Sequence, residues 1–252
     1  MAYRALLLLL VLILSGWGAA AAAPPPTGQS TPRMTPLTTE RPYRYLALGD
    51  SYTIGEGVAV AERWPVQQVA ALRQQGITID EPEIVAKTGW TTSELADGIA
   101  QAQPQGPYDL VSLLIGVNNQ YRGLSQEEYR DEFAGLLATA VALAGGQANR
   151  VFVVSIPDWS VTPFGQRRDV QEVSAAIDAF NAINRSETEN RGIIYIDITP
   201  ISRQAFSDIS LVADDTLHPS GKMYQLWVEK MLPILIPRLD SSLTRRSEAS
   251  GR

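Results

Sequence analysis

Short apolar runs alternate with longer amphipathic stretches between about residues 43 and 236. The apolar runs are rich in Val, Ile and Leu, as expected for strands buried on both faces, and they lie at residues 43–48, 83–86, 110–115, 150–156 and 193–197. The amphipathic stretches predict helices near residues 63–75, 91–102, 125–145, 168–190 and 220–236. This alternation favours an α/β fold with a parallel sheet that helices cover on both faces.

Three of the predicted helices begin with residues that favour a helix N-cap. Thr92 or Ser93 lies at the start of one helix, and Ser220 lies at the start of the last. Ser125 is followed three residues later by Glu128, which is a capping-box spacing. These signals support the helix starts that the periodicity predicts.

The two ends of the chain differ from this middle part. Residues 1–23 combine a basic start, an apolar core and small residues, which is typical of a secretory signal peptide. The uncharged run at residues 5–23 is nearly long enough to span a bilayer, so an uncleaved membrane anchor is the alternative. We expect a Pro/Thr-rich linker at residues 24–42, one domain at 43–238 and a polar tail at 239–252. The protein is therefore expected to be exported, to a periplasm or the medium.

Composition narrows the classes of function. The chain has 252 residues, of which 45% are hydrophobic and 19% charged, as in ordinary globular proteins. A net charge of −6 without any Lys/Arg block argues against nucleic acid as a partner. The absence of cysteine excludes disulfides, a thiol nucleophile and a Cys-ligated metal.

A candidate nucleophile follows the first predicted strand, in the run Gly49-Asp50-Ser51. Ligand sites of parallel α/β folds lie beyond the carboxyl ends of the strands, and the glycine leaves room for a substrate near the Ser51 hydroxyl. Taken alone, the triplet is better explained as a tight turn or as an N-cap for the next segment. A serine hydroxyl also needs an adjacent base before it can attack near neutral pH.

The only histidine of the chain, His218, is the candidate base. It lies in a polar loop before the last predicted helix, and Asp215 precedes it by three residues. That spacing lets the Asp215 carboxylate reach Nδ1 of the imidazole within one turn and fix its tautomer. Asp214 is the alternative partner, and the spacing favours Asp215.

Two further residues could donate hydrogen bonds to a developing oxyanion. Asn118 follows the third predicted strand and Gly89 follows the second, and the backbone N–H of Ser51 would complete the set. Each residue alone is better explained as a turn former. Together with Ser51 and His218, however, they fill four different roles at the edge of the sheet where the fold places chemistry, which favours a hydrolase site.

These residues resemble the sequence blocks of the SGNH/GDSL hydrolase family, in the same order and over about residues 43–236. The blocks are Gly49-Asp50-Ser51, Gly89, Gly116-Val117-Asn118 and Asp215-Thr216-Leu217-His218. The third block of the family usually ends in aspartate, where this chain has Asn119. We expect this difference to affect how the loop is held and not to abolish catalysis.

The resemblance implies a three-layer α/β/α sandwich with a five-stranded parallel sheet, which is a flavodoxin-like arrangement. It also implies a triad of Ser51, His218 and Asp215, and an oxyanion hole formed by Ser51, Gly89 and Asn118. A mechanism of this kind uses no metal and no organic cofactor.

The substrate is less well determined than the reaction. Aromatic residues on the predicted loops could pack along an acyl chain or stack on a sugar, or could simply cap the core: Trp90, Tyr121, Trp159 and Phe164. We expect a lipid-type esterase or lysophospholipase. The alternatives are a carbohydrate O-deacetylase and a non-catalytic glycan-binding surface protein. Partners are thus a small ester, an acyl lipid or an acylated glycan, and the protein is expected to be a monomer.

Overall fold

A computed structural model describes residues 41–250. The predicted signal peptide or anchor at residues 1–23 lies outside the described residues, and so does nearly all of the predicted linker at 24–42.

Five strands form one sheet in which every neighbouring pair is parallel. The strand order is β2-β1-β3-β4-β5, so the chain adds β2 on one side of β1 and all later strands on the other. The crevice between β1 and β3 is therefore the topological switch point, where ligands of such sheets bind. The predicted strands are confirmed with small shifts at their ends: β1 Tyr45–Gly49, β2 Glu83–Ala86, β3 Leu110–Leu114, β4 Val151–Val154 and β5 Ile194–Ile196.

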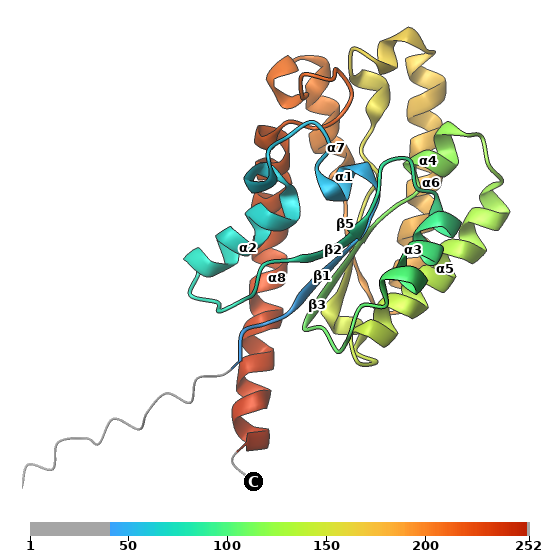
Figure 1. Cartoon of the computed structure of the whole chain (residues 1–252). Coiled ribbons are helices and arrows are strands. Elements are labelled where there is room, and N and C mark those ends of the chain that lie inside the picture. Colours follow the sequence, from blue (N-terminus) through green and yellow to red (C-terminus); the bar gives the residue numbers. More distant parts are fainter. Residues whose placement is uncertain (1–40, 251–252) are drawn as a thin grey trace, which may run out of the picture. The chain divides into compact units, whose positions relative to one another are not determined.

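Helices cover both faces of the sheet and complete a three-layer sandwich (Figure 1). One layer consists of α2 and α8, and the other consists of α3, α5 and α6 (Figure 1). The short helices α1, α4 and α7 follow strands at the carboxyl edge. The bounds are α1 Ser51–Ile54, α2 Trp64–Gln74, α3 Thr92–Ala102, α4 Val117–Tyr121, α5 Gln126–Leu143, α6 Val170–Glu189, α7 Thr199–Ser202 and α8 Gly221–Ser250.

Short 3₁₀ turns connect these elements, most of them in the loops after β4 and β5. They are η1 Val60–Glu62, η2 Ala148–Arg150, η3 Trp159–Val161, η4 Gly165–Arg167, η5 Arg203–Phe206 and η6 Ile209–Leu211.

Side-chain caps explain where several helices begin. Ser125 Oγ accepts hydrogen bonds from the backbone N–H groups of the first turn of α5, and Ser220 Oγ accepts one from Met223 N, as predicted. The cap of α3 was predicted at Thr92 or Ser93, and this is wrong by one residue. Thr91 caps α3 instead, because its side chain and Glu94 exchange hydrogen bonds with each other's backbone N–H groups in a capping box.

The end of α8 also differs from the prediction. The sequence pattern ends the helix near residue 236 because polar residues follow, but α8 continues to Ser250 through most of the predicted polar tail. Pro233 and Pro237 lie inside the helix. Apolar periodicity marks the part of a helix that packs on a core, and a helix can extend beyond that part. In the described portion of the chain, no helix combines the length and apolar character needed to cross a membrane.

Candidate active site

Ser51 is the first residue of α1, directly beyond the carboxyl end of β1. Asp50 is the N-cap of this helix, and its Oδ1 accepts a hydrogen bond from Tyr52 N at 3.0 Å. The cap turns the chain sharply out of the sheet and leaves the Ser51 side chain at the surface of the crevice. Ser51 is only 5% exposed, so its hydroxyl is accessible mainly from one side.

The imidazole of His218 lies between Ser51 and Asp215. Its Nε2 is 3.0 Å from Ser51 Oγ, and its Nδ1 is 2.6 Å from Asp215 Oδ2. The other oxygen of Asp215 accepts the backbone N–H groups of Leu217 and His218, both at 2.9 Å. The structure therefore brings together the three residues that the sequence predicts, and it places Asp215, not the neighbouring Asp214, on the imidazole.

The local turn from Asp215 to His218 requires an unusual backbone. Thr216 has φ of +69°, in the left-handed region that a β-branched residue rarely adopts. This conformation lets the Asp215 carboxylate contact two backbone N–H groups and the imidazole within four residues. The carbonyl of Thr216 accepts a hydrogen bond from Phe164 N at 3.1 Å, which ties the turn to the loop after β4.

The hydrogen bonds keep Asp215 ionised. Burial by itself would raise the pKa of this carboxyl, but the N–H groups of Leu217 and His218 and the imidazole outweigh it, so the pKa is lowered from its usual value. A carboxylate held in this state stabilises a protonated imidazole on Nδ1. The edge of the Tyr52 ring packs against the imidazole, with centroids 5.6 Å apart.

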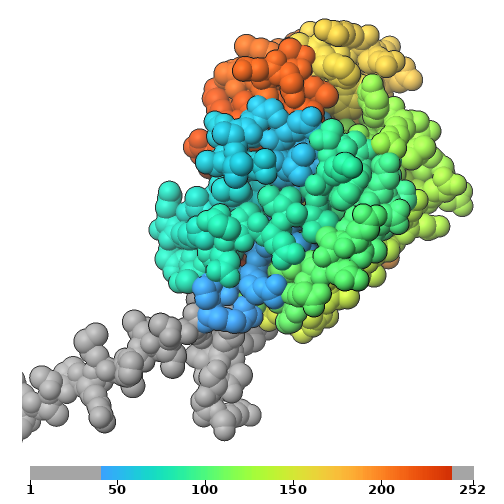
Figure 2. Space-filling model, viewed as in Figure 1, coloured from blue at the N-terminus to red at the C-terminus, as the bar shows by residue number. Residues whose placement is uncertain are grey.

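The loop after α1 packs beside the loop that carries Asp215, at the carboxyl edge of the sheet (Figures 1 and 2). Gly57 permits this close approach: a Cβ atom there would lie 3.1 Å from Asp215 Oδ2, and its φ is +82°. Glu56 accepts a hydrogen bond from the Thr88 hydroxyl, so this loop also contacts the segment after β2.

Asn118 of α4 and Arg122, the C-cap residue that follows α4, hold the loop after β2. Asn118 Nδ2 donates to the carbonyl of Trp90 at 2.9 Å, and Arg122 Nη2 donates to the carbonyl of Gly89 at 2.5 Å. Arg122 also pairs with Glu94 at 3.3 Å. Gly89 has φ of +83°, a conformation that favours glycine. Gly89 and Asn118 consequently line the same pocket as Ser51, as predicted from their places after β2 and β3.

Asn119 stands where the family pattern usually has aspartate, and it is buried. Its Oδ1 accepts from Thr92 N at 3.1 Å, and its Nδ2 donates to Thr92 Oγ1 at 2.6 Å. The Thr92 hydroxyl in turn donates to Glu132. The amide thus joins the loop after β3 to the first turn of α3, so the difference changes which groups hold the loop and leaves Asn118 in the pocket.

A pocket of about 220 Å³ opens above Ser51. Tyr121, Trp159 and Phe164 line it, as the sequence suggested for aromatic residues of these loops. Trp90 does not: its ring packs against α3, where a Cβ on Gly98 would lie 2.1 Å from the ring. Only the backbone carbonyl of Trp90 takes part, as the acceptor for Asn118. The remaining lining residues are Ser51, Tyr52, Thr88, Gly89, Val117, Asn118, Leu217 and His218.

The sequence model of the GDSL-like lipase/acylhydrolase family matches residues 47–226, which is well over half of the chain. The protein belongs to this family. No curated protein sequence matches the chain. Membership in the GDSL-like family agrees with the resemblance that the four sequence blocks indicated.

Solved structures of GDSL-like and related hydrolases share this fold. TesA is 18% identical with a TM-score of 0.58, over 77% of this chain and 99% of TesA. The psychrotrophic esterase EstA from Pseudoalteromonas sp. is 17% identical with a TM-score of 0.57, over 78% and 98% of the two chains. Axe2, an acetylxylan esterase from Geobacillus stearothermophilus, is 18% identical with a TM-score of 0.58, over 76% and 93%. At these identities the similarity establishes the fold alone.

Sequence reasoning missed several residues of this GDSL-like site. Tyr52 and Leu217 line the pocket, and their positions next to Ser51 and His218 were the available signal. Arg122 and Gln120 have no such signal. Arg122 contacts the site through the Gly89 carbonyl, and Gln120 contacts it through the Trp159 ring. Contacts of this kind depend on where loops meet, which spacing along the chain does not show.

Asp50 of the Gly-Asp-Ser block gives a prediction about stability. Its carboxyl is fully buried, and in the described part of the chain Oδ2 has no hydrogen-bond partner. Burial raises its pKa from 3.8 to about 7, although the Tyr52 N–H opposes this. The folded state therefore binds the proton more tightly than the unfolded state, so stability falls as pH rises from about 4 to 7.

Asp50→Asn is expected to remove this loss, because an amide is neutral and still accepts from Tyr52 N. At about 1.4 kcal/mol per pKa unit, the free energy of unfolding would increase by up to about 4 kcal/mol above pH 7 and change little near pH 4. Urea unfolding of both proteins at pH 4 and pH 8 measures this. An equal change at the two pH values would contradict the assignment.

Proposed function

We propose that the protein is a carboxylic ester hydrolase that forms a covalent acyl-enzyme on Ser51. The observation that carries this proposal is the continuous chain of hydrogen bonds from Ser51 Oγ through His218 to Asp215 at the floor of a pocket. A serine, an imidazole and a carboxylate in this order form a nucleophile, a general base and the group that orients the base.

In the first half of the reaction, His218 Nε2 takes the proton of Ser51 as Oγ attacks the ester carbonyl. The carbonyl oxygen becomes an oxyanion, which the N–H groups of Ser51 and Gly89 and the Asn118 amide stabilise. One Asn118 N–H already donates to Trp90 O, which leaves the other for this role. The tetrahedral intermediate then collapses, and His218 gives its proton to the departing alkoxide, which leaves as an alcohol.

In the second half, His218 takes a proton from a water molecule as that water attacks the acyl carbon. The new oxyanion uses the same donors, and its collapse breaks the bond to Ser51 Oγ, which recovers its proton from His218. The acid is released and the enzyme returns to its starting state. These steps use only residues of the chain and need no metal or organic cofactor.

Arg122 contributes by positioning the oxyanion donors, since its side chain holds the Gly89 carbonyl and its backbone N–H donates to the Asn118 carbonyl. We expect Arg122→Met to lower kcat about five- to tenfold and to leave KM nearly unchanged, because oxyanion donors act mainly in the transition state. The effect stays modest because the side chain is 45% exposed. Steady-state kinetics measures it, and Arg122→Lys should recover part of kcat.

Arg130→Met is the matched control for Arg122. Arg130 is equally exposed at 45%, but it pairs with Glu187 between α5 and α6, away from the pocket. This control variant should have the same kcat and KM as the wild-type protein. An equal loss in the two variants would mean that Arg122 matters only for general stability.

Two substrate classes have support. The apolar lining by Val117, Trp159, Phe164 and Leu217 favours an ester with an apolar acyl group, as in the lipid-type esterases expected from the sequence. The small volume of about 220 Å³ favours the second candidate, a carbohydrate O-deacetylase. The structurally similar Axe2 is an acetylxylan esterase, which also suits the second candidate. The hydrogen-bonded triad speaks against a non-catalytic binding protein.

Labelling with a fluorophosphonate tests the proposal without knowledge of the natural ester. EstA, which shares the fold, has been solved inhibited by monoethylphosphonate. We expect one phosphonate per chain, located on Ser51 by peptide mass analysis, together with loss of p-nitrophenyl ester hydrolysis. If a folded protein is labelled at another serine or is not labelled at all, the binding-protein alternative would be favoured.

The location of the enzyme relative to the cell is proposed as well. We infer that the enzyme is exported, because residues 1–23 have the pattern of a signal peptide, or of an anchor if they are retained. N-terminal sequencing of the protein from its native host distinguishes a cleaved chain from a retained anchor, and recovery from the cytosol with an intact start would contradict export.

A further inference from the structure

One wall of the pocket above Ser51 is a single indole. Trp159 lies in η3, the turn after β4, and is 4% exposed. Its Nε1 donates to Gln120 Oε1 at 2.9 Å. The Tyr121 ring contacts it edge-on with centroids 5.5 Å apart, and the Phe164 ring lies at 6.0 Å. Trp159 is therefore held by one hydrogen bond and two rings, so its indole has little room to move aside.

A second, much smaller cavity of about 20 Å³ shares this wall. Trp159, Tyr52, Leu217 and His218 line both the small cavity and the pocket above Ser51. Its other lining residues include Leu211, Ala205 and Met223. Trp159 thus forms part of the wall of both spaces.

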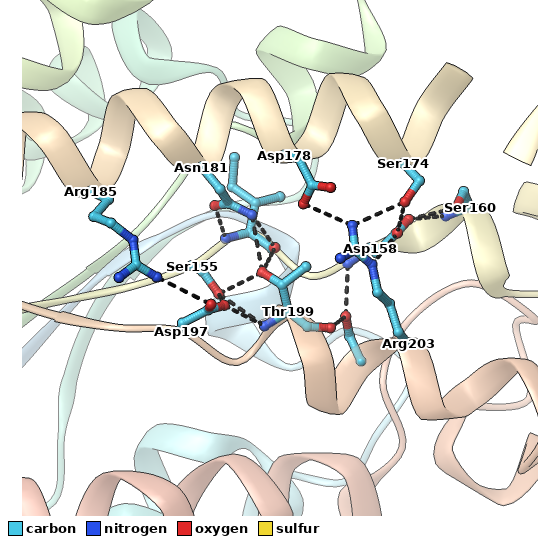
Figure 3. Close-up of polar contacts among 12 residues, drawn as sticks. Ser155, Asp158, Ser160, Ser174, Asp178, Asn181, Arg185, Asp197, Thr199 and Arg203 are labelled. Carbon is cyan, nitrogen blue, oxygen red and sulfur yellow. Dashed lines mark hydrogen bonds and ion pairs between the residues drawn. The ribbon is translucent and has the colours of Figure 1, made fainter. Parts of the chain in front are cut away.

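Buried ionic contacts fix the loop from behind. The Asp158 carboxylate, with 0% side-chain exposure, accepts from Ser160 N at 3.0 Å, Ser160 Oγ at 2.6 Å, Ser174 Oγ at 2.6 Å and Arg203 Nε at 2.9 Å (Figure 3). Arg203 also donates to Asp178 at 2.8 Å and so links the loop to α6 (Figure 3). Burial alone would raise the pKa of Asp158, but these donors lower it.

Such a carboxylate resists displacement, since removing one partner leaves a buried charge uncompensated. The backbone N–H of the same residue donates to Ser202 Oγ at 2.8 Å, which adds a contact to α7. Asp158 precedes Trp159 directly, so a fixed Asp158 also fixes the backbone of Trp159, and the contacts of the indole orient its ring.

We propose that Trp159 is the end wall of the acyl pocket, held in place by the Asp158–Arg203 ion pair, and that this wall restricts the enzyme to short acyl chains. The inference rests on the proposed ester hydrolysis and names its substrate class. A pocket of about 220 Å³ is smaller than the roughly 300–1,000 Å³ of pockets that hold drug-sized ligands. This size suits a short acyl group better than a palmitoyl chain.

Two series of esters test the wall. In the first, the p-nitrophenol leaving group is constant and the acyl chain runs from acetate to palmitate. In the second, the acyl group is acetyl and the alcohol lengthens. We expect the wild-type protein to prefer butanoate or hexanoate in the first series, with kcat/KM falling beyond it.

Trp159→Ala should move the optimum of the acyl series to octanoate or longer. Each further buried methylene raises kcat/KM about fourfold, so two of them raise the octanoate-to-butanoate ratio about 15-fold. The alcohol series should keep its wild-type profile. Phe206→Ala, which removes an aromatic ring that is 69% exposed and does not line the pocket, should change neither series.

Arg203 tests the support behind the wall. Arg203→Met should also raise the octanoate-to-butanoate ratio, and Arg203→Lys should keep a ratio closer to the wild type, since an ammonium still pairs with Asp158. If Arg203→Met does not fold, the double variant Asp158→Asn/Arg203→Met removes both charges and should show the raised ratio. An unchanged ratio in whichever of these variants folds would overturn the supporting role.

The outcomes separate this inference from the proposed function. Absence of Ser51-dependent turnover on every ester would remove the proposed function itself. Ser51-dependent turnover with an unchanged acyl profile in Trp159→Ala, or a change confined to the alcohol series, would overturn the inference and leave the hydrolase intact. A wild-type optimum at palmitate would also overturn it and would favour a lysophospholipase.

Discussion

Ser51→Ala should lower kcat for p-nitrophenyl butyrate by about 10⁴-fold or more, since no acyl-enzyme can form without the hydroxyl. Removing the nucleophile from a triad abolishes the covalent route, and the oxyanion donors alone retain only a small residual rate. The change removes one hydrogen bond, to His218 at 3.0 Å, so the melting temperature should stay close to that of the wild type. Steady-state hydrolysis assays measure the loss of kcat, and thermal unfolding measures the melting temperature.

Ser207→Ala is the matched control for Ser51→Ala. Ser207 is exposed on the loop after α7, and its hydroxyl donates only to the nearby Gln204 carbonyl at 3.2 Å. This variant should keep full activity. A Ser51→Ala protein with turnover near the wild-type rate would sink the assignment of Ser51 as nucleophile.

Asp215→Asn should lower kcat by about 10³- to 10⁴-fold. An asparagine oxygen can still accept from Leu217 N and His218 N, so the turn should keep its shape. Its amide group would then face Nδ1 and donate to it, which forces the imidazole proton onto Nε2. An imidazole with its proton on Nε2 cannot take the proton of Ser51. The side chain is 35% exposed, which places the expected loss below that of Ser51→Ala.

Asp214→Asn separates this specific role from a general effect of charge near the site. Asp214 is the adjacent carboxylate and is exposed, while the imidazole bonds to Asp215. We expect less than a twofold change in kcat for the Asp214 variant. Equal losses in the two variants would indicate that the local negative charge matters and that the hydrogen bond to Nδ1 does not.

The strands were predictable from sequence because each is a short apolar run bounded by polar or small residues. All five predicted strands lie in the sheet, with ends shifted by up to two residues. Helix boundaries were less certain. Thr91 caps α3 in place of Thr92 or Ser93, because any of these three adjacent hydroxyl residues fits the N-cap pattern. The length of α8 was missed because its last turns follow the last apolar positions.

The residues of the candidate site were also predictable, as far as each had its own place after a strand. Ser51, Gly89 and Asn118 line one pocket because the carboxyl ends of β1, β2 and β3 are neighbours in the sheet. His218 joins them from the loop before α8. Trp90 was an equally good candidate by position, but its ring turns toward α3. Position after a strand places a backbone and does not fix which way a side chain points.

The sequence by itself predicted the layers, the candidate nucleophile and the candidate base, because hydrophobic periodicity and a unique histidine are local features of the chain. The spacing favoured Asp215 over Asp214, and the tertiary structure shows the contact of Asp215 with the imidazole. Only the tertiary structure shows that Arg122 holds the Gly89 carbonyl and that Arg203 pairs with Asp158, next to Trp159. Those contacts join segments from separate loops or depend on a single backbone angle, such as that of Thr216. These contacts form only when the packed sheet brings the loops together, so they cannot be predicted from a pattern along the chain.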